Sequence, residues 1–280
     1  MKTIVKYLLL HVLKHPAFAR NSFFILALFL GSCNAFEFSP NQTSDRNSPV
    51  NLNEKNIAKL GRNADDTVTI AFTGDSQRFY AHIDRFVKKA NTLPEIDFIL
   101  LAGDISDFGL LQEFEWVNSR LAKLSKPYIG VIGNHDLVAN GEVVFEKMFG
   151  PLNLSFVYDS IRFVTHNTNS LEYKFRKVPD MNWLGNALKP AANVKHIVTV
   201  SHVPPFSPDE FNTDLEGPYT RLLSQTPNLL VSLHGHVHEH RDFYPYDDHV
   251  RYITSYAYEQ DAFVLLKIVD GKVLKSIIDY

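Results

Sequence analysis

The chain has 280 residues, of which 45% are hydrophobic and 12% aromatic, and this is enough for one sizeable α/β core without a second domain. A net charge of -3 and the lack of a long basic tract argue against nucleic-acid binding. A single cysteine excludes an internal disulfide and a cysteine-rich zinc site, whereas twelve histidines suit a metal site built from nitrogen and oxygen ligands.

The first 33 residues have the layout of an export signal. Basic residues precede an apolar run at 23–30, which is shorter than the roughly 20 residues that span a membrane, and small residues then lead to Cys33. The sequence LGSC at 30–33 resembles the lipobox of bacterial lipoproteins, whose cysteine becomes the lipid-modified first residue. We therefore expect a lipoprotein-type signal peptide over 1–33. A lipid on Cys33 would anchor the protein to a membrane of a bacterial cell envelope, facing the periplasm or the cell surface.

A change of composition marks the next segment, from 34 to 66. Asn, Ser, Pro and charged residues dominate it and leave few apolar side chains to bury. We expect a polar tether here, which leads to one folded domain over 67–280.

Strand-like and helix-like runs alternate beyond the tether and predict an α/β fold. The early strand–helix alternation is the βαβ rhythm of a largely parallel sheet with helices packed on it. Asp270 and Gly271 between the last two strands predict a hairpin. The expected strands are 68–73, 98–102, 128–132, 161–165, 196–200, 228–233, 251–254, 263–268 and 273–278, and the expected helices are 80–91, 111–124 and 181–188.

Polar motifs follow five of the expected strands. Each alone has a simple structural explanation, such as a helix cap, a turn or a satisfied buried imidazole. A parallel sheet, however, brings the ends of its strands to one edge, so the motifs together predict a pocket of carboxylates, an amide and imidazoles. A bound cation offsets the cost of burying that collection. The motifs are GDSQ (74–77), GDISD (103–107), GNHD (133–136), SHVPP (201–205) and GHVH (235–238).

The spacing of the last histidines suits a pair of metals. In an extended segment, residues two apart point to the same side, so His236 and His238 can bind two adjacent metals. His234 and His240 share this spacing. Spacing alone therefore leaves four candidates.

As an ordered set, the five motifs resemble those of the calcineurin-like metallophosphoesterases, over residues 68–238. The resemblance implies two facing β-sheets flanked by helices, with a dinuclear metal centre at the strand ends. It also implies a hydrolase of phosphate monoesters or diesters that uses two divalent ions (Mn, Fe, Zn or Mg) and a metal-bridging hydroxide. The implied ligands are Asp75, Gln77, Asp104 and His238 for one metal, and Asp104, Asn134, His202 and His236 for the other.

The resemblance also assigns a catalytic group that does not bind metal. His135 would lie near the leaving-group oxygen, as a proton donor or as a positive charge that stabilises it. We expect Asp136 to orient His135 by accepting a hydrogen bond from the other ring nitrogen.

Gln77 departs from the commonest family motif, which has His at this position. An amide oxygen is a workable neutral ligand for harder cations such as manganese or magnesium. The alternative is that Gln77 binds no metal, which would leave a weakened or single-metal site. We expect ligation, because the other motif positions are intact.

Three functions remain open on the sequence alone. The first is a phosphate-ester hydrolase, the second a lipid-anchored binding protein on the same fold without turnover, and the third a hydrolase of pyrophosphate bonds. His135 argues against the second, since a binding site has no need of it. We expect the specificity loops at 137–151, 167–180 and 204–218. In and beside the last loop, the aromatic side chains either stack on a substrate or close the core, and these are Phe206, Phe211 and Tyr219.

Overall fold

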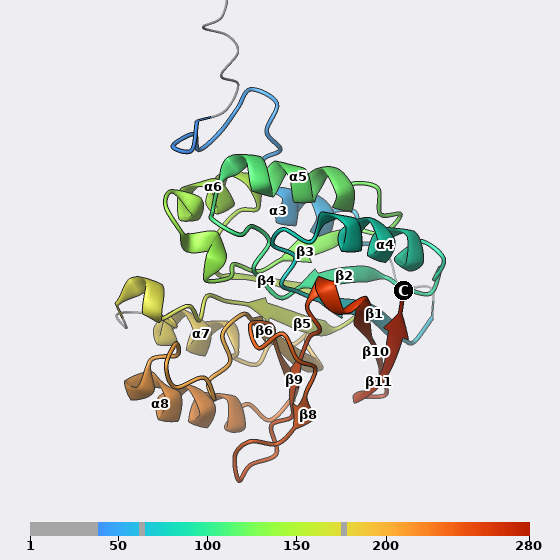
Figure 1. Cartoon of the computed structure of the whole chain (residues 1–280). Coiled ribbons are helices and arrows are strands. Elements are labelled where there is room, and N and C mark those ends of the chain that lie inside the picture. Colours follow the sequence, from blue (N-terminus) through green and yellow to red (C-terminus); the bar gives the residue numbers. More distant parts are fainter. Residues whose placement is uncertain (1–38, 62–64, 175–177) are drawn as a thin grey trace, which may run out of the picture. The chain divides into compact units, whose positions relative to one another are not determined.

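Two mixed β-sheets form the centre of the structure, a computed structural model that describes residues 39–61, 65–174 and 178–280 (Figure 1). The five-stranded sheet has the order β11-β10-β1-β2-β3, and the six-stranded sheet has the order β4-β5-β6-β7-β9-β8. The predicted signal peptide and Cys33 lie outside the described residues. The first sheet comprises β1 (Val68–Thr73), β2 (Phe98–Leu101), β3 (Tyr128–Gly130), β10 (Ala262–Val269) and β11 (Lys272–Asp279). The second comprises β4 (Leu154–Tyr158), β5 (Ile161–Thr165), β6 (His196–Ser201), β7 (Leu229–His234), β8 (Asp242–Phe243) and β9 (Tyr252–Thr254).

The predicted parallel strands are confirmed within both sheets. Strands β1, β2 and β3 pair in parallel, as do β5, β6, β7 and β9. Antiparallel strands lie at the edges, where β10 and β11 form the predicted hairpin across Asp270 and Gly271, while β4 and β8 border the second sheet. The sheets therefore direct the carboxyl ends of their parallel strands toward the motif loops.

Strand β1 is buried along its whole length because both of its faces are covered. Ile70 and Phe72 point into the layer between the sheets, where they pack with Val198 and Val231 of the second sheet. Ala71 points the opposite way, into the cluster beneath the helices. Because side chains alternate between the two faces of a strand, β1 contributes to two hydrophobic clusters, one between the sheets and one beneath the helices.

Helices cover the outer face of each sheet (Figure 1). The first sheet carries α4 (Tyr80–Ala90), α5 (Leu111–Leu121) and α6 (Gly141–Met148). The second carries α7 (Met181–Ala187) and α8 (Thr213–Ser224). No helix in the described part of the chain combines the length and the apolar character that a membrane crossing requires.

The expected tether is wrong for its described residues from Asn41 onward, which belong to the same compact unit as the domain. Helix α3 (Leu52–Ile57) lies in this segment. Its buried Asn53 and Asn56 donate side-chain hydrogen bonds of 2.8 Å each to the carbonyls of Gly130 and Tyr128 in β3. The segment therefore packs through amide groups, which satisfy the edge of a strand and require few apolar residues.

Two of the expected specificity loops contain helices. Helix α6 lies within 137–151, and α8 begins within 204–218. Phe211 and Tyr219 are 1% and 0% exposed and pack edge to face in the core beneath α8, with ring centroids 5.3 Å apart. Phe206 packs on Phe243. Of the two alternatives for these aromatic rings, closing the core is the one the structure shows.

Candidate metal centre

The candidate ligands follow the carboxyl ends of five parallel strands. Asp75 and Gln77 come after β1, Asp104 after β2 and Asn134 after β3, while His202 follows β6 and the two remaining histidines follow β7. The folding of both sheets thus brings residues 163 positions apart to one place. All seven predicted ligands lie at this edge.

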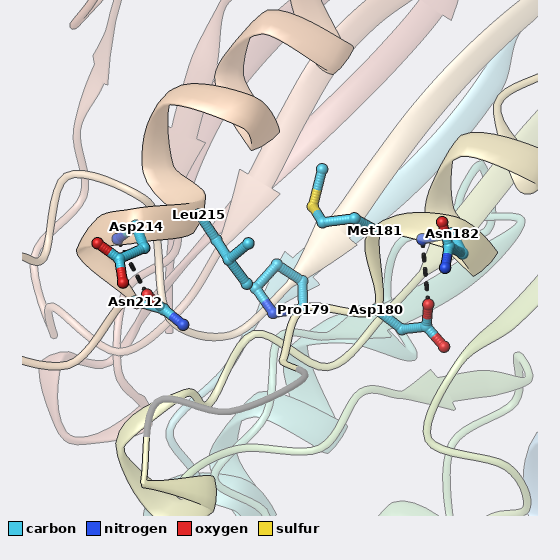
Figure 2. A pocket seen from close by; sticks show the side chains of 7 residues that line it. All are labelled: Pro179, Asp180, Met181, Asn182, Asn212, Asp214 and Leu215. Carbon is cyan, nitrogen blue, oxygen red and sulfur yellow. Dashed lines mark hydrogen bonds between the residues drawn. The ribbon is translucent and has the colours of Figure 1, made fainter.

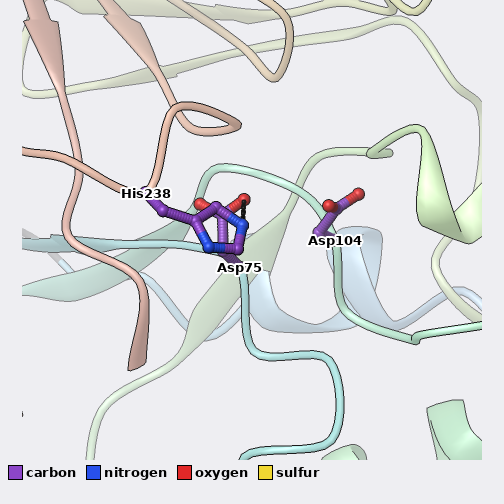
Figure 3. A group of neighbouring side chains, drawn as sticks. All are labelled: Asp75, Asp104 and His238. Carbon is purple, nitrogen blue, oxygen red and sulfur yellow. Dashed lines mark ion pairs between the residues drawn. The ribbon is translucent and has the colours of Figure 1, made fainter. Parts of the chain in front are cut away.

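The first predicted ligand set converges around Asp75. One ligand atom each of Asp75, Asp104 and His238 lies within 4.8 Å of the others, and Figure 3 shows the His238 ring beside the Asp75 carboxylate. His238 Nε2 is 3.4 Å from Asp75 Oδ1. Gln77 completes the set, because its Nε2 donates to Asp104 Oδ2 at 3.2 Å. Ligation by the Gln77 oxygen stays a prediction.

The second predicted set converges around Asn134. Its Oδ1 lies 2.9 Å from His202 Nε2 and 3.2 Å from His236 Nδ1. His202 Nε2 is also 3.2 Å from Asp104 Oδ1. Asp104 therefore contacts members of both sets, the position expected of a bridging ligand.

The three candidate histidines share an arrangement that fits metal binding. Each directs one ring nitrogen toward the carboxylates or Asn134, and the other nitrogen lies near an oxygen outside the set. Such outer oxygens hold a metal-binding imidazole in the correct tautomer and orientation. The outer distances are 2.6 Å from His202 Nδ1 to the Ala102 carbonyl, 3.2 Å from His236 Nε2 to Glu210 Oε2, and 3.6 Å from His238 Nδ1 to Glu259 Oε1.

The charges of the buried groups also fit a cation. Burial disfavours the charged forms of Asp104 and His202, but their mutual attraction outweighs it, lowering the pKa of Asp104 and raising that of His202. Burial, with the nearby His202, lowers the pKa of His236 to about 3. Two buried carboxylates, Asp75 and Asp104, thus favour a proton on the neighbouring imidazoles and raise the pKa of both His202 and His238. A divalent ion can take over the role of that proton.

The backbone of the site is strained. Five candidate ligands have positive φ, with 54° at Asp75, 36° at Gln77, 52° at Asp104, 72° at His236 and 53° at His238. This region is uncommon for residues other than glycine, and Asp and His adopt it more readily than Gln. Such strain persists only where the surroundings determine the conformation.

Close contacts explain why a glycine directly precedes Asp104 and Asn134. A Cβ at Gly133 would lie 2.1 Å from the Asp104 backbone nitrogen, and a Cβ at Gly103 would lie 2.5 Å from His202 Nδ1. Both contacts are shorter than atoms tolerate. The glycines therefore allow the loops of β2, β3 and β6 to pack close enough for their ligands to meet.

The reasoning from the His-x-His spacing is wrong, although two of its four candidates, His236 and His238, lie in the site. Strand β7 ends at His234, and both following histidines have left-handed rather than extended backbone. His234 is fully buried between the hydroxyls of Ser201 and Ser232, at 3.0 and 2.8 Å. His240 Nδ1 lies 2.8 Å from the Thr254 carbonyl. These two histidines serve the fold.

His135 lies beside the ligand set, as predicted. Its backbone N–H donates to Asp104 Oδ1 at 3.0 Å, and its Nε2 is 4.0 Å from Asp104 Oδ2. The ring is 40% exposed, so it is open to a substrate. Its Nδ1 lies 2.9 Å from the Asp107 carbonyl oxygen, which identifies Asp107 as the residue that orients the ring.

The expected role of Asp136 is wrong. Its carboxylate is fully buried and accepts hydrogen bonds from the backbone N–H groups of Ile105, Ser106 and Gly133 and from the Ser106 hydroxyl, at 2.7–3.1 Å. All four donors lie in the loops of Asp104 and Asn134, and the His135 ring is not among them. Asp136 therefore holds together the two loops that carry the candidate ligands Asp104 and Asn134.

Sequence reasoning missed three neighbours of the site, namely Asp107 as a partner of His135, Glu210 and Glu259. Asp107 carries a signal, because it ends the GDISD motif, and Arg78 holds its carboxylate at 2.9 Å. Glu210 lies in a turn and Glu259 in the short 3-10 helix Tyr258–Gln260, both outside every motif. Only the folded chain brings them to the histidines.

A pocket of about 550 Å³ lies between the first turns of α7 and α8 (Figure 2). Asp180 and Asn212 cap the two helices at its rim by accepting hydrogen bonds from backbone N–H groups. Its lining contains none of the candidate ligands and consists of Pro179, Asp180, Met181, Asn182, Asn212, Asp214 and Leu215. The pocket is therefore distinct from the metal site.

Comparison with known proteins agrees with the family resemblance of the five motifs. A family model described as calcineurin-like phosphoesterase matches residues 68–240. A probable cyclic nucleotide phosphodiesterase of Xenorhabdus bovienii is 30% identical over 31% of this chain and 34% of its own length. A 3',5'-cyclic-nucleotide phosphodiesterase of Nostoc is 24% identical over 58% of this chain and 62% of its own. This chain thus spans less than two thirds of either relative.

Solved structures agree on the fold. A dimetal phosphatase from Danio rerio superposes with a TM-score of 0.58 at 14% identity, and the match covers 77% of this chain and all of the phosphatase chain. At this identity the likeness concerns the fold alone.

Proposed function

Because the chain belongs to the calcineurin-like phosphoesterase family, and is thereby a hydrolase of phosphoric esters, we propose that it is a phosphodiesterase with a dinuclear metal centre. One observation carries the dinuclear proposal. Two ligand sets meet at the buried carboxylate of Asp104, which lies 3.2 Å from both Gln77 Nε2 and His202 Nε2. The diester is proposed because both curated relatives are named as cyclic nucleotide phosphodiesterases.

The proposed division of the residues between two metals is supported by their grouping in the structure. Asp75, Gln77 and His238 would hold one ion, Asn134, His202 and His236 the other, and Asp104 both. When bound, two divalent ions would bind the phosphate oxygens and supply an activated water for in-line attack at phosphorus. Asp75 has a further role, because its carboxylate accepts the backbone N–H of His236 at 3.1 Å and so connects the two groups of ligands.

His135 supplies the proton that the leaving group needs. Attack at phosphorus breaks the bond to the leaving oxygen, which departs with a negative charge. The protonated Nε2 of His135 faces the site and transfers its proton to that oxygen, while the Asp107 carbonyl holds Nδ1–H at 2.9 Å. His135 ends the step neutral and regains a proton from solvent through its exposed face.

The proposal extends to location. A lipid on Cys33 would tether the enzyme to a bacterial envelope membrane, with the catalytic domain in the periplasm or outside the cell. The support is the lipobox-like sequence at 30–33.

The decisive experiment compares substrates and metals on protein that begins after Cys33. We expect Mn²⁺ to restore hydrolysis of bis(p-nitrophenyl) phosphate and of cyclic AMP after removal of metal with EDTA, with weaker hydrolysis of p-nitrophenyl phosphate. His135→Ala should lower kcat by about 10²–10⁴-fold at unchanged metal content.

Each other outcome identifies a different function. Tight binding of two metals with no hydrolysis of any ester would favour the binding protein. Activity on the monoester or on pyrophosphate alone would contradict the phosphodiesterase proposal. Loss of metal from His135→Ala would remove this residue from the catalytic role.

A further inference from the structure

We propose that Glu210 is a positioning residue, which holds the His236 ring so that its Nδ1 faces the metal shared with Asn134 and His202. The inference rests on the proposed dinuclear centre and deepens it. It assigns a carboxylate outside every sequence motif to the binding of one of the two metals.

The two nitrogens of His236 have separate tasks. Nδ1 lies 3.2 Å from Asn134 Oδ1, on the side of the ligand set, and Nε2 lies 3.2 Å from Glu210 Oε2, on the outer side. A neutral imidazole carries one proton, and a carboxylate beside Nε2 places that proton there. Nδ1 then presents a lone pair to the metal.

The backbone of His236 alone does not fix the ring. Its N–H is held by the Asp75 carboxylate at 3.1 and 3.2 Å, and its φ of 72° is strained. These backbone restraints do not set the side-chain rotamer, which the edge-to-face packing of the His202 ring, with centroids 5.2 Å apart, limits on one side. Glu210 supplies the missing restraint at the far end of the ring.

Glu210 is itself held in place by its neighbours in the chain. Phe211 is buried beside it and donates its N–H to the Ser207 carbonyl at 2.8 Å. The carbonyl of Glu210 accepts the N–H of Leu171 at 3.2 Å, which joins two of the expected specificity loops. Asn212, labelled in Figure 2, caps α8 two residues further on. The carboxylate therefore projects from a fixed turn, as an effective positioning group requires.

Two other glutamates provide comparisons. Glu259 lies 3.6 Å from His238 Nδ1 and its side chain is 44% exposed, whereas the Glu210 side chain is 32% exposed and that of its partner His236 is 15% exposed. Solvent weakens the more exposed contact. Glu172 is an exposed acid on the loop that pairs with Glu210, and its charge interacts with His135 and Asp104. It is a matched control for loss of one negative charge near the site.

The test measures Mn²⁺ binding by titration calorimetry, with no substrate present. Asn134→Ala first identifies which of the two binding steps belongs to the site of His236. Glu210→Ala should weaken that step by about 10–100-fold and leave the other step unchanged. Glu210→Gln keeps an oxygen acceptor and should recover most of the affinity. Glu172→Ala should change neither step.

Three results would overturn the inference. The first is an unchanged Mn²⁺ affinity in Glu210→Ala. The second is an equal weakening of Mn²⁺ binding in Glu172→Ala, which would indicate an effect of charge alone. The third is the loss of both Mn²⁺-binding steps in Glu210→Gln as well as in Glu210→Ala. Wild-type protein that binds only one Mn²⁺ or none would overturn the proposed dinuclear centre together with this inference. Wild-type protein that binds two ions, with no effect of Glu210→Ala, would overturn this inference alone.

Discussion

Replacing Asp136 with asparagine tests how the loops that carry the candidate ligands Asp104 and Asn134 are held together. The native carboxylate accepts four hydrogen bonds, two on each oxygen, from donors in the loops of Asp104 and Asn134. Asparagine keeps one oxygen and turns an NH₂ group toward the other two donors. Each buried donor that loses its acceptor costs about 1–3 kcal/mol, so Asp136→Asn should lower the free energy of unfolding by about 2–6 kcal/mol.

The assay is urea unfolding followed by circular dichroism, with ΔG compared at equal m-values. Asp97→Asn is the control, because Asp97 is a partly buried carboxylate that accepts only two hydrogen bonds, from Thr69 N and Tyr158 Oη, at 2.7 and 3.0 Å. Asp136→Asn should also weaken binding of both metals, whereas the control should not. A destabilisation no larger than that of Asp97→Asn would refute the reasoning and show that other contacts join the loops.

Substitutions at three further residues have defined outcomes. Cys33→Ser should move the protein from the membrane fraction to the soluble fraction with activity unchanged, and continued membrane retention would contradict a lipid anchor. Gln77→Ala should selectively weaken binding of the metal held by Asp75, while Gln77→His should shift metal preference toward softer ions and make metal binding depend on pH. Identical metal content and selectivity in wild type and both variants would show that Gln77 binds no metal. Hydrogen bonds from Arg251 lower the pKa of Asp242 to about 2. The ionised Asp242 therefore stabilises the folded protein by about 2 kcal/mol above pH 4, and this contribution is lost as the pH falls toward 2. Urea unfolding should therefore separate wild type from Asp242→Asn at pH 7 and about half as much at pH 3, and a constant difference would contradict the assigned pKa.

The strands were predictable wherever an apolar run ends sharply. Strand β1 and β5 occupy the expected ranges, because buried strands require continuous apolar residues and the motif loops that follow do not. The helix 80–91 was expected from its amphipathic spacing and ends one residue earlier, at Ala90.

Elements stabilised by tertiary contacts were not predictable. Helix α3 is fixed by the side-chain amides of Asn53 and Asn56, which the sequence presents as ordinary polar residues. Helix α8 contains Gly217 and Pro218, two residues that typically end helices. It forms because Tyr219 and Leu223 bury fully beneath it, and that gain exceeds the local cost.

In the candidate site too, the residues within local motifs were predictable and those that depend on tertiary contacts were not. Motif order led to seven candidate ligands, which the structure brings to one edge of the sheets, because each motif is a local signature. The partner of His135 was misassigned to Asp136, since adjacency in sequence says little about the direction of a buried carboxylate. Glu210 was missed because its contact with His236 depends on the path of the loop between β6 and α8.

The left-handed backbone of the candidate ligands lowers the thermal stability of the protein. Glycine at Gln77, His236 or His238 would relieve strain of about 1–2 kcal/mol at each position, and a domain of this size gains about 2–4 °C in melting temperature per kcal/mol. A library selected only for heat resistance should therefore accumulate glycine at these three positions and lose its candidate metal ligands as it becomes more stable. Engineers who want a robust active enzyme should hold these positions constant and search for stabilising changes elsewhere in the chain.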